Sequence, residues 1–574
     1  MSRVRRPAGR RERVTGAASE APASGRGPGR FAGWLDRAPL VAAAVAALVY
    51  LPSLRVGFLY DDFPQIVDNR GIRDLAALRT VLTFDRARPL LSLSFALNYA
   101  VSGLAPWSYH LVNVALHAAS AAVVAVLFGW MADRSGWPRA REAALAGACL
   151  FAATPMAAET VAYVASRSSG LAALLGLASL ATLASGLPGP SAFRRVVSWI
   201  LLALAMATKE EAVAVPLLLL LLDRFFVGER RWADTARRWR LHAPGVLLVV
   251  VGLVGRRLAT GAWLPLGEAA RLPYAVYQWA LFPVYLARHV VPVDPALYRG
   301  HGTPWPPGGA VLALCGVTAA LAAAAFALRR RRPEWTFAVA WLAAALLPSS
   351  SLVPLAEPMA DHRAYLGGAG VLFAMGGLLA RVGRPVVAAA ALLLCAGRAW
   401  QVQWTFADPV AVWEDAARRA PGSAVAWRSL ADARLERGDA DGAREAFARA
   451  LAADPRDAKT WTNLGVLLAG LGRADEAEHA LREALKVAPP ALAGSVHDNL
   501  GMVLRGRGRE TEAIAEFEAA VAADPRLVQP RISLAQLLLR RGEGARARAL
   551  LDEAVAQAPT AEEAAWIERL RGPR

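Results

Sequence analysis

Two adjacent carboxylates, Asp61 and Asp62, stand in a polar segment that directly follows the first long apolar stretch of the sequence. A pair of acids at the point where a helix leaves a membrane is costly unless the side chains are solvated, paired or functional. A carboxylate in that position can take the proton from an attacking hydroxyl group, which is general-base chemistry. The alternative is a solvated loop that happens to be acidic, and other polar residues must decide between the two interpretations.

Further polar residues recur at the ends of other apolar segments. If the apolar segments cross a membrane one after another, these residues lie on the same side of it as the acidic pair. Lys209 is the only lysine in the first 401 residues, and together with Arg363 it can neutralise a phosphate group. The remaining polar positions are Arg88, His110, Asn113, His117, Glu159, Arg167, Glu210, Asp361, His362 and Tyr365. The two early histidines and Asn113 between them fall on one helical face. This favours a hydrogen-bonded network between helices, with a metal site as the alternative.

The composition indicates a membrane protein. Of the 574 residues, 55% are hydrophobic and 20% are charged, and the formal net charge is +18. Residues 1–401 hold 41 basic and 21 acidic side chains, whereas the remainder holds 24 and 26. A nucleic-acid-binding protein would carry its basic patch on a soluble domain. Here the excess positive charge lies in the hydrophobic part, which is typical of a multi-span protein with basic cytoplasmic loops, so we expect no nucleic-acid partner.

Eleven apolar segments within residues 38–401 are candidates for membrane spans. They cover about 40–54, 107–131, 142–158, 168–187, 195–208, 211–223, 241–258, 308–328, 335–354, 366–380 and 385–401. Arginines gather in alternate connections, on the same side as the basic, unstructured tail at residues 1–37, which places that side in the cytoplasm. The acidic pair then lies on the outer side. A further apolar stretch, 272–293, breaks the alternation, and we expect it to lie along the outer interface or to re-enter.

A repeat occupies residues 402–574. Five prolines follow one another at intervals of 34, 34, 36 and 34 residues, at Pro421, Pro455, Pro489, Pro525 and Pro559. This is the period of the tetratricopeptide (TPR) repeat, a pair of helices. We predict an α-solenoid of four full repeats, preceded by a half-unit with Trp413 and closed by a capping helix near 561–570. A chain that starts in the cytoplasm and crosses the membrane eleven times ends on the outer side, so the repeat array lies there. A TPR groove usually binds a peptide or a protein, and packing against the membrane domain or assembly is the alternative.

Five strings, taken in order, resemble the transmembrane-and-TPR protein O-mannosyltransferase-like family. They are YDDFPQIVDN, RPLLSLSFALNYAVSGLAPWSYHLVNVALH, TPMAAETVAYVASRSSGLAAL, ATKEEAVAVPLLLLLLD and DHRAYLG, and a TPR array follows them. The resemblance covers nearly the whole chain after residue 38. It implies an all-α protein with the GT-C fold of membrane glycosyltransferases. It also implies a polyprenyl-phosphate-linked sugar donor, cleaved on the outer face, with the sugar passed to an acceptor hydroxyl.

The resemblance also implies roles for single residues. The catalytic base maps onto Asp61, with Asp62 beside it. The late EHR.Y motif of the family maps onto Asp361, His362, Arg363 and Tyr365, and Arg363 is assigned to the lipid phosphate. By their charge alone, Lys209 and Arg88 can assist it. Family members often carry His-Pro-x-His before the glutamate, whereas this chain has residues 155–158, Pro-Met-Ala-Ala, before Glu159. We therefore expect no metal and no cofactor. His110, Asn113, Glu210 and Glu159 are expected to support the site.

These features predict a multi-pass glycosyltransferase of the inner membrane, with its N-terminus in the cytoplasm and its TPR array outside. The sugar, mannose by the resemblance, passes to a Ser or Thr hydroxyl of a polypeptide, and the TPR array presents that acceptor or binds a partner. One alternative is a non-catalytic TPR scaffold on a membrane anchor, and another is transfer to a lipid or a glycan. If the chain is an enzyme, Asp61, Lys209 and Arg363 should line one cavity. If it is a non-catalytic scaffold, packed apolar helices should lie between them.

Overall fold

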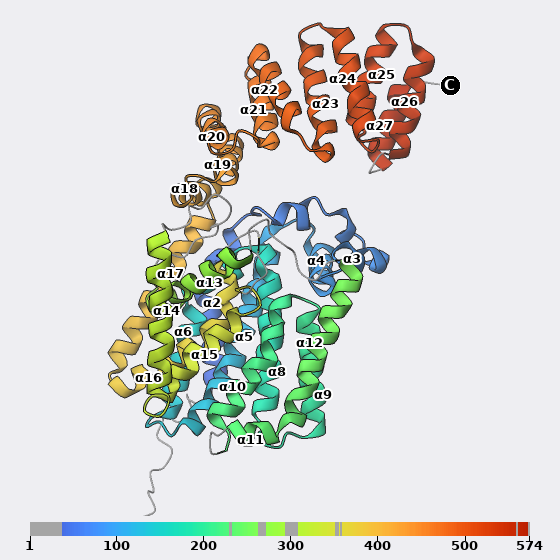
Figure 1. Ribbon diagram of the computed structural model, residues 1–574. Helices are drawn as coiled ribbons and strands as arrows, with labels where there is room; N and C mark the ends of the chain where they lie inside the picture. The colour runs from blue at the N-terminus through green and yellow to red at the C-terminus, as the bar shows by residue number, and fades with distance from the viewer. Residues whose placement is uncertain are drawn as a thin grey trace, which may run out of the picture.

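Helices form all the regular secondary structure in the part of the chain that the computed structural model describes. That part comprises residues 37–228, 232–261, 271–292, 308–350, 355, 359–557 and 561–571. Figure 1 shows a bundle of long helices and, above one end of it, an array of paired helices. The predicted all-α fold is therefore confirmed. The predicted basic tail, apart from Arg37, and Pro559 lie outside the described residues.

Within the residues that the structure describes, seven helices of the bundle are long and apolar enough to cross a membrane. They are α2 with η1 (Ala38–Arg55), α5 (Pro106–Ser135), η6 with α8 (Val164–Ala184), α12 (Trp239–Thr260), α14 (Gly308–Leu328), η8 with α16 (Asp361–Val382) and α17 (Pro385–Phe406). An eighth span results if α6 (Ala140–Ala153) and the segment Pro155–Ala162, which meet at 44°, are counted as one bent pair. The other three predicted spans are shorter helices, α9 (Ala192–Met206), α10 (Val215–Phe226) and α15 (Pro333–Leu346).

Short helices between α2 and α5 cover the end of the bundle that faces the TPR array (Figure 1). They are η2 (Phe63–Val67), η3 (Arg70–Ile72), η4 (Leu75–Ala77), α3 (Leu78–Phe84) and α4 (Pro89–Ser102). Arg167 of α8, only 1% exposed, ties this region to the bundle. Its guanidinium group donates to Asn113 Oδ1 at 2.8 Å and to the Tyr109 carbonyl at 2.9 Å, and it lies over the Phe95 ring at 4.9 Å. Arg167 is therefore a structural anchor.

Helix α13 (Arg271–Val290) is fixed at both ends to the TPR-facing end of the bundle. The Tyr274 hydroxyl donates to the Ser349 carbonyl, just past the end of α15, at 2.9 Å. Near the other end of α13, Arg288 forms a buried ion pair with Asp361 at the start of η8. Both contacts lie at the TPR-facing end of the bundle. Helix α11 (Trp232–Arg237) lies in the opposite end.

Four helix pairs form the array, as the proline period predicts. They are α19 (Ala424–Glu436) with α20 (Ala440–Ala453), α21 (Ala458–Gly470) with α22 (Ala474–Val487), α23 (Pro490–Gly506) with α24 (Glu510–Ala523), and α25 (Gln529–Arg540) with α26 (Gly544–Gln557). Helix α18 (Pro409–Arg419) precedes them and α27 (Ala561–Arg571) follows. Gly438 and its three counterparts join the paired helices with φ between 73° and 83°, a conformation that suits glycine. Helix α17 continues past residue 401 to Phe406, so the bundle ends later than the sequence predicts.

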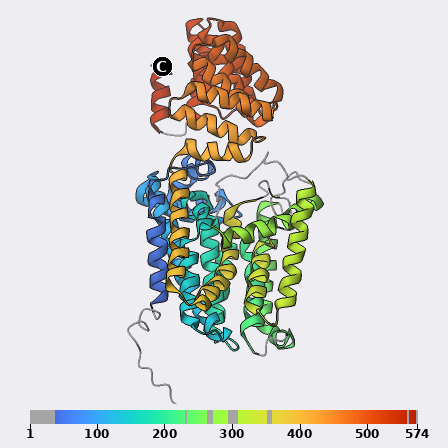
Figure 2. The same ribbon diagram turned by 90° about the vertical axis from the view of Figure 1, so that its left-hand side faces the viewer.

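The array is joined to the bundle through its first helices, as Figure 2 shows from a second side. One continuous cluster of buried apolar side chains runs from Tyr50 and Leu59 in the bundle through Phe406 and Trp413 to Leu430 in the first repeat. A second cluster begins at Leu468 and fills the later repeats. The first repeat is thus packed as part of the membrane domain.

Candidate active site

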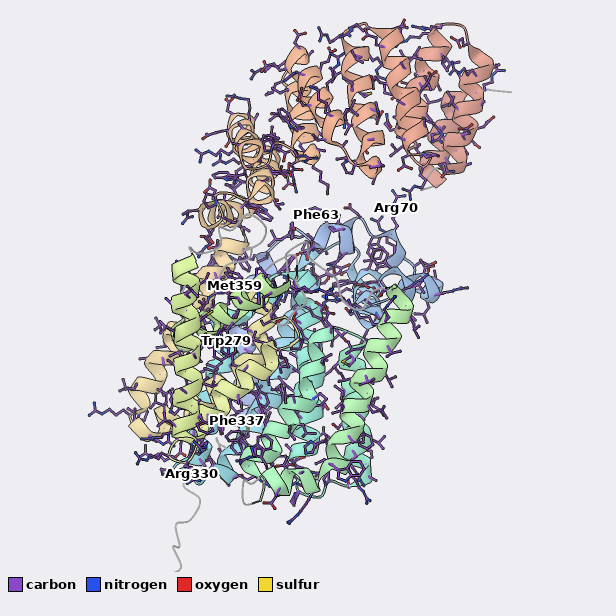
Figure 3. The ribbon with its side chains drawn as sticks, in the orientation of Figure 1. Phe63, Arg70, Trp279, Arg330, Phe337 and Met359 are labelled. Atoms are coloured by element: carbon purple, nitrogen blue, oxygen red, sulfur yellow. The ribbon has the colours of Figure 1, made fainter. Side chains whose placement is uncertain are left out.

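A cavity of about 390 Å³ lies at the TPR-facing end of the bundle, where Figure 3 labels Phe63 and Met359. Predicted site residues that line it are Asp61, Arg88, Lys209, Glu210, His362 and Arg363. They come from the segment after α2, the residue before α4, the turn between α9 and η7 (Glu210–Ala214), and η8 (Asp361–Ala364). Asp61, Lys209 and Arg363 thus share one cavity, which is what the enzyme hypothesis requires and the scaffold hypothesis does not.

Asp61 is held at the cavity wall by Tyr163, a lining residue that the sequence analysis did not single out. The Asp61 backbone N–H donates to the Tyr163 hydroxyl at 3.0 Å, and that hydroxyl also hydrogen-bonds the carboxylate. Burial raises the pKa of Asp61, although the Tyr163 hydrogen bond and the charge of Arg88 act in the opposite direction. A raised pKa suits a carboxylate that must accept a proton.

Asp62 does not line the cavity, so the prediction that it stands beside the base at the reacting centre is wrong. Its side chain is fully buried, and its two oxygens accept the backbone N–H groups of Leu59 at 2.9 Å and Ala165 at 2.6 Å. Burial raises the pKa of Asp62 to about 7, against these hydrogen bonds. Adjacent side chains in this turn point in different directions, one toward the cavity and one into the protein. Asp62 ties the loop to the start of α8.

The cations of the cavity are held by a second pair of acids. Glu210 accepts from Arg88 at 3.2 Å and from Arg256 of α12 at 3.0 Å. The Lys209 ammonium group lies 3.1 Å from Glu211 and donates to the Ser169 hydroxyl at 2.6 Å. Arg256 was missed, although a charge inside the predicted span 241–258 is itself a signal of function. Among the described residues Asp61 has no cationic partner in an ion pair, unlike Glu210 and Glu211.

Two buried acids position η8 from behind the cavity. Asp361 pairs with Arg288 of α13, whose Nη2 lies 2.7 Å from Oδ2. Glu159 accepts the backbone N–H of His362 at 3.0 Å and contacts Nδ1 of the same residue at 2.6 Å. Asp361 and Glu159 themselves do not line the cavity. They fix the short helix so that His362 and Arg363 reach it. Arg288 was also missed, although it lies in an apolar stretch.

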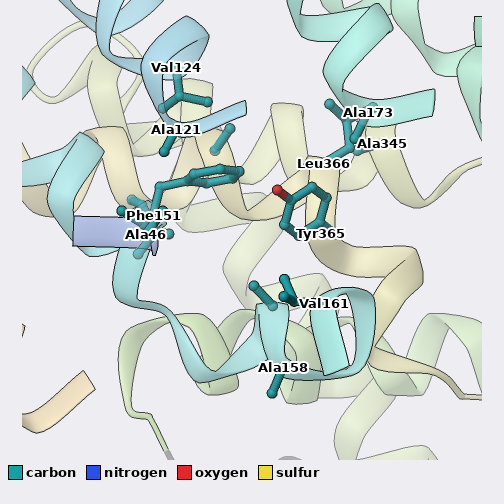
Figure 4. Close-up of a cluster of buried hydrophobic side chains, with 14 of the residues drawn as sticks. Ala46, Ala121, Val124, Phe151, Ala158, Val161, Ala173, Ala345, Tyr365 and Leu366 are labelled. Carbon is teal, nitrogen blue, oxygen red and sulfur yellow. The ribbon is translucent and has the colours of Figure 1, made fainter. Parts of the chain in front are cut away.

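The remaining predicted residues lie deeper, between packed helices. The Tyr365 hydroxyl lies 2.7 Å from Nδ1 of His117, and Nε2 of that histidine lies 3.0 Å from the Ala152 carbonyl. Figure 4 shows Tyr365 next to Phe151 in a buried apolar cluster, with ring centroids 5.3 Å apart. Asn113 accepts from Arg167, and His110 is fully buried in α5. His117 and Asn113 thus form the interhelical hydrogen bonds that the spacing favours, whereas His110 shows no such bond among the described residues. Within the described residues no group of three His, Cys, Asp or Glu is arranged to hold a metal ion.

Comparisons with known proteins give matches to a repeat family and to named relatives. Family models described as tetratricopeptide repeat match residues 406–458, 434–497 and 504–567. The human protein O-mannosyl-transferase TMTC2 is 35% identical over 156 residues, which cover 25% of this chain and 18% of the relative. Human TMTC4 is 32% identical over 220 residues, which cover 33% and 30%.

The chain spans less than a third of the length of these curated relatives. Among solved structures, PilF of Pseudomonas aeruginosa matches with 25% identity and a TM-score of 0.26, over 27% of this chain and 70% of PilF. The matched stretches cover 25% and 33% of this chain, not nearly all of it after residue 38 as the strings predict. The suspected family is confirmed: the curated homologues of this chain are the TMTC protein O-mannosyl-transferases, and its C-terminal part is a TPR solenoid.

Proposed function

We propose that this chain is a membrane glycosyltransferase that moves mannose from a polyprenyl-phosphate donor to a Ser or Thr hydroxyl of a polypeptide. The observation that carries the proposal is the shared cavity, which is lined by Asp61, Lys209, Arg88 and Arg363. A carboxylate and several cations in one cavity are what a hydroxyl attack with a phosphate leaving group needs. The names of the homologues support a protein acceptor.

In the proposed reaction the acceptor oxygen attacks C1 of the sugar while Asp61 takes the hydroxyl proton. The bond between C1 and the phosphate oxygen breaks, its electron pair stays on the phosphate, and the configuration at C1 inverts. Arg363, with Lys209 and Arg88, stabilises the charge that develops on the departing phosphate. A phosphate leaves without protonation by a strong acid, so one essential carboxylate is enough. The side-chain cations supply the electrostatic stabilisation, and the proposed reaction is metal-independent.

The proposed location is the inner membrane, with the cavity and the TPR array on the outer side. Arginines at the opposite end of the bundle support this orientation, because basic loops stay in the cytoplasm. Figure 3 places Arg330 at that end, far from Phe63. The TPR array would present the acceptor or bind a partner protein above the cavity. A polyprenyl-phosphate sugar, an acceptor polypeptide and the bilayer are thus the proposed partners.

Sugar transfer by the purified full chain in proteoliposomes tests the proposal. Polyprenyl phosphate carrying labelled mannose is the donor, and the same lipid carrying glucose and soluble GDP-mannose are comparison donors. We expect label on protein only with the lipid-linked mannose. Label that enters only lipid or glycan would overturn the protein acceptor, and transfer from GDP-mannose alone would overturn the lipid-linked donor.

The rate of transfer should fall in acid at a higher pH than an ordinary aspartate would give. Asp61 must be ionised to accept a proton, and burial holds its pKa above the ordinary value near 4. Activity is therefore present above the raised pKa and is lost as the pH falls through it. The measurement is kcat/KM between about pH 4 and pH 8, which reports the free enzyme. If kcat/KM falls only at or below pH 4, the result would contradict the role of Asp61.

Replacing Trp413 by Ala should lower the transfer rate by about tenfold, because small displacements of a catalytic group cost rate. Tyr60, next to Asp61, adopts an unusual left-handed φ of 42° and packs its ring against Trp413 of α18 at 5.6 Å. Losing the indole frees this turn. Trp413→Phe should restore part of the rate.

The matched control is Trp461→Ala in the second repeat, whose indole donates to the Pro455 carbonyl. Both variants are assayed with a short acceptor peptide, and thermal unfolding of each confirms that the chain is folded. If Trp413→Ala and Trp461→Ala lose the same fraction of the transfer rate, Trp413 acts only through the stability of the array.

A further inference from the structure

Arg398 is a charged residue inside α17, a helix that is apolar enough to span a membrane. An ionisable side chain in a span is expensive and marks a functional site by default. Among the described residues Arg398 forms no ion pair with a carboxylate, and its guanidinium group donates to the side-chain oxygen of Gln401 on the same helix. A neutral amide leaves the charge of the guanidinium group uncompensated. Arg398 therefore calls for an anion from outside the chain.

The membrane boundary lies within two turns of Arg398. Trp400 and Trp404 are four residues apart on α17, so they share one face, and their side chains are 48% and 51% exposed. Exposed tryptophans of this kind mark the level of lipid headgroups. The Arg55 guanidinium group, at the end of η1, lies 5.3 Å over the Trp404 ring. Trp404 is the sixth residue after Arg398, about 9 Å along the helix axis.

A second cavity, of about 360 Å³, lies between α17 and α18 at this level. Arg398, Gln401 and Thr405 line it from α17, and Arg418 and Arg419 line it from α18. Figures 1 and 2 show α18 crossing the end of α17, so the cavity sits in the angle between them. None of its lining residues lines the candidate active site.

The acids of this cavity already have partners. Asp415 lies 2.6 Å from Arg419 and 3.8 Å from Arg418, and Glu414 lies 2.9 Å from Arg434 of α19. Neither acid compensates Arg398, and one carboxylate is shared by two arginines. The angle between α17 and α18 therefore carries net positive charge at the depth of the lipid phosphates, where it attracts anionic headgroups.

We infer that this cavity binds the phosphate of an anionic glycerophospholipid from the leaflet at the TPR-facing end. Arg398 and Arg418 donate to the phosphate oxygens, and a guanidinium group suits this because it presents several donors in a fixed plane. The acyl chains lie along α17, where Leu393 and Leu394 are 71% and 62% exposed just below Arg398. The bound lipid fixes the angle at which the TPR array leaves the membrane.

Lipid retention by the purified full chain tests this site. The chain is exchanged from nanodiscs of phosphatidylcholine with phosphatidylglycerol into mild detergent, and the lipids that remain are counted by native mass spectrometry. We expect at least one retained phosphatidylglycerol in the wild type and a roughly fivefold or greater loss of its retention in Arg398→Gln. Arg398→Gln/Arg418→Gln should lose more. The matched control is Arg546→Gln in the last repeat, an exposed arginine that forms an ion pair with Glu518.

The source of the phosphate is distinguished by competition. Millimolar inorganic phosphate should leave the retained phosphatidylglycerol in place, because the acyl chains contribute to binding. Equal retention of phosphatidylcholine and phosphatidylglycerol, or unchanged retention in Arg398→Gln, would overturn the inference. Equal loss in Arg546→Gln, or preferential capture of polyprenyl phosphate, would also overturn it. Because retention is measured without sugar transfer, the result does not depend on the proposed function.

Discussion

Replacing Asp61 by Asn should reduce sugar transfer by about 10²- to 10⁴-fold while the chain stays folded. An amide cannot accept the hydroxyl proton, so the acceptor loses its base. The amide keeps the size of the carboxylate, and its oxygen can still accept a hydrogen bond from the Tyr163 hydroxyl, which holds the side chain in the wild type. The backbone N–H of residue 61 keeps its bond to the same hydroxyl. The loss should therefore appear in kcat rather than in stability.

The control for this experiment lies in the same segment. Asp68 is an exposed carboxylate that does not line the cavity, so Asp68→Asn makes the same change of charge without touching the site. Transfer from labelled polyprenyl-phosphate mannose is measured for both variants at saturating donor. Rates within about twofold of wild type are expected for Asp68→Asn. The same result for Asp61→Asn would mean that another group accepts the proton.

The sequence predicts the architecture well because the architecture depends on the period of the repeat and on the hydropathy of the membrane segments. The spacing of the prolines, 34 or 36 residues, locates every helix pair of the array. The arginine alternation places Asp61, Lys209 and Arg363 at one end, and the structure places them in one cavity. The length of α15 was less predictable, because this helix ends at Leu346 whereas the predicted segment runs to residue 354. Helices α9, α10 and α15 are shorter than a full span, since polar turns such as the one at Lys209 interrupt the apolar segments.

The direction of single side chains could not be predicted, because it depends on contacts between segments distant in sequence. Nothing in the pair Asp61-Asp62 shows which acid faces the cavity. The answer depends on Ala165, about a hundred positions away, whose N–H binds the second acid. Arg256 and Arg288 were missed for the same reason, since their carboxylate partners come from other helices. Charges inside apolar segments were the available signal, and the same signal draws attention to Arg398.

Replacing Asp62 by Ala should lower the stability of the folded chain and leave the transfer reaction itself unaffected. The change leaves the N–H groups of Leu59 and Ala165 buried without acceptors, at about 1–3 kcal/mol each. We expect the midpoint of thermal unfolding in detergent to fall by several degrees and the yield of folded chain to drop. Asp61→Asn should shift the midpoint by no more than about a degree, because its side chain lies at a cavity wall.

The substitutions at Asp61 and Asp62 therefore separate two roles, proton transfer by Asp61 and attachment of the loop to α8 by Asp62. If Asp62 only ties the loop to α8, a second change that restores stability elsewhere should recover most of the activity of Asp62→Ala per folded molecule. No such change should rescue Asp61→Asn, because stability cannot replace a missing base. An Asp62→Ala chain that unfolds at the wild-type temperature but transfers no sugar would place Asp62 in the reaction. It would also require its carboxylate to leave both backbone partners during turnover.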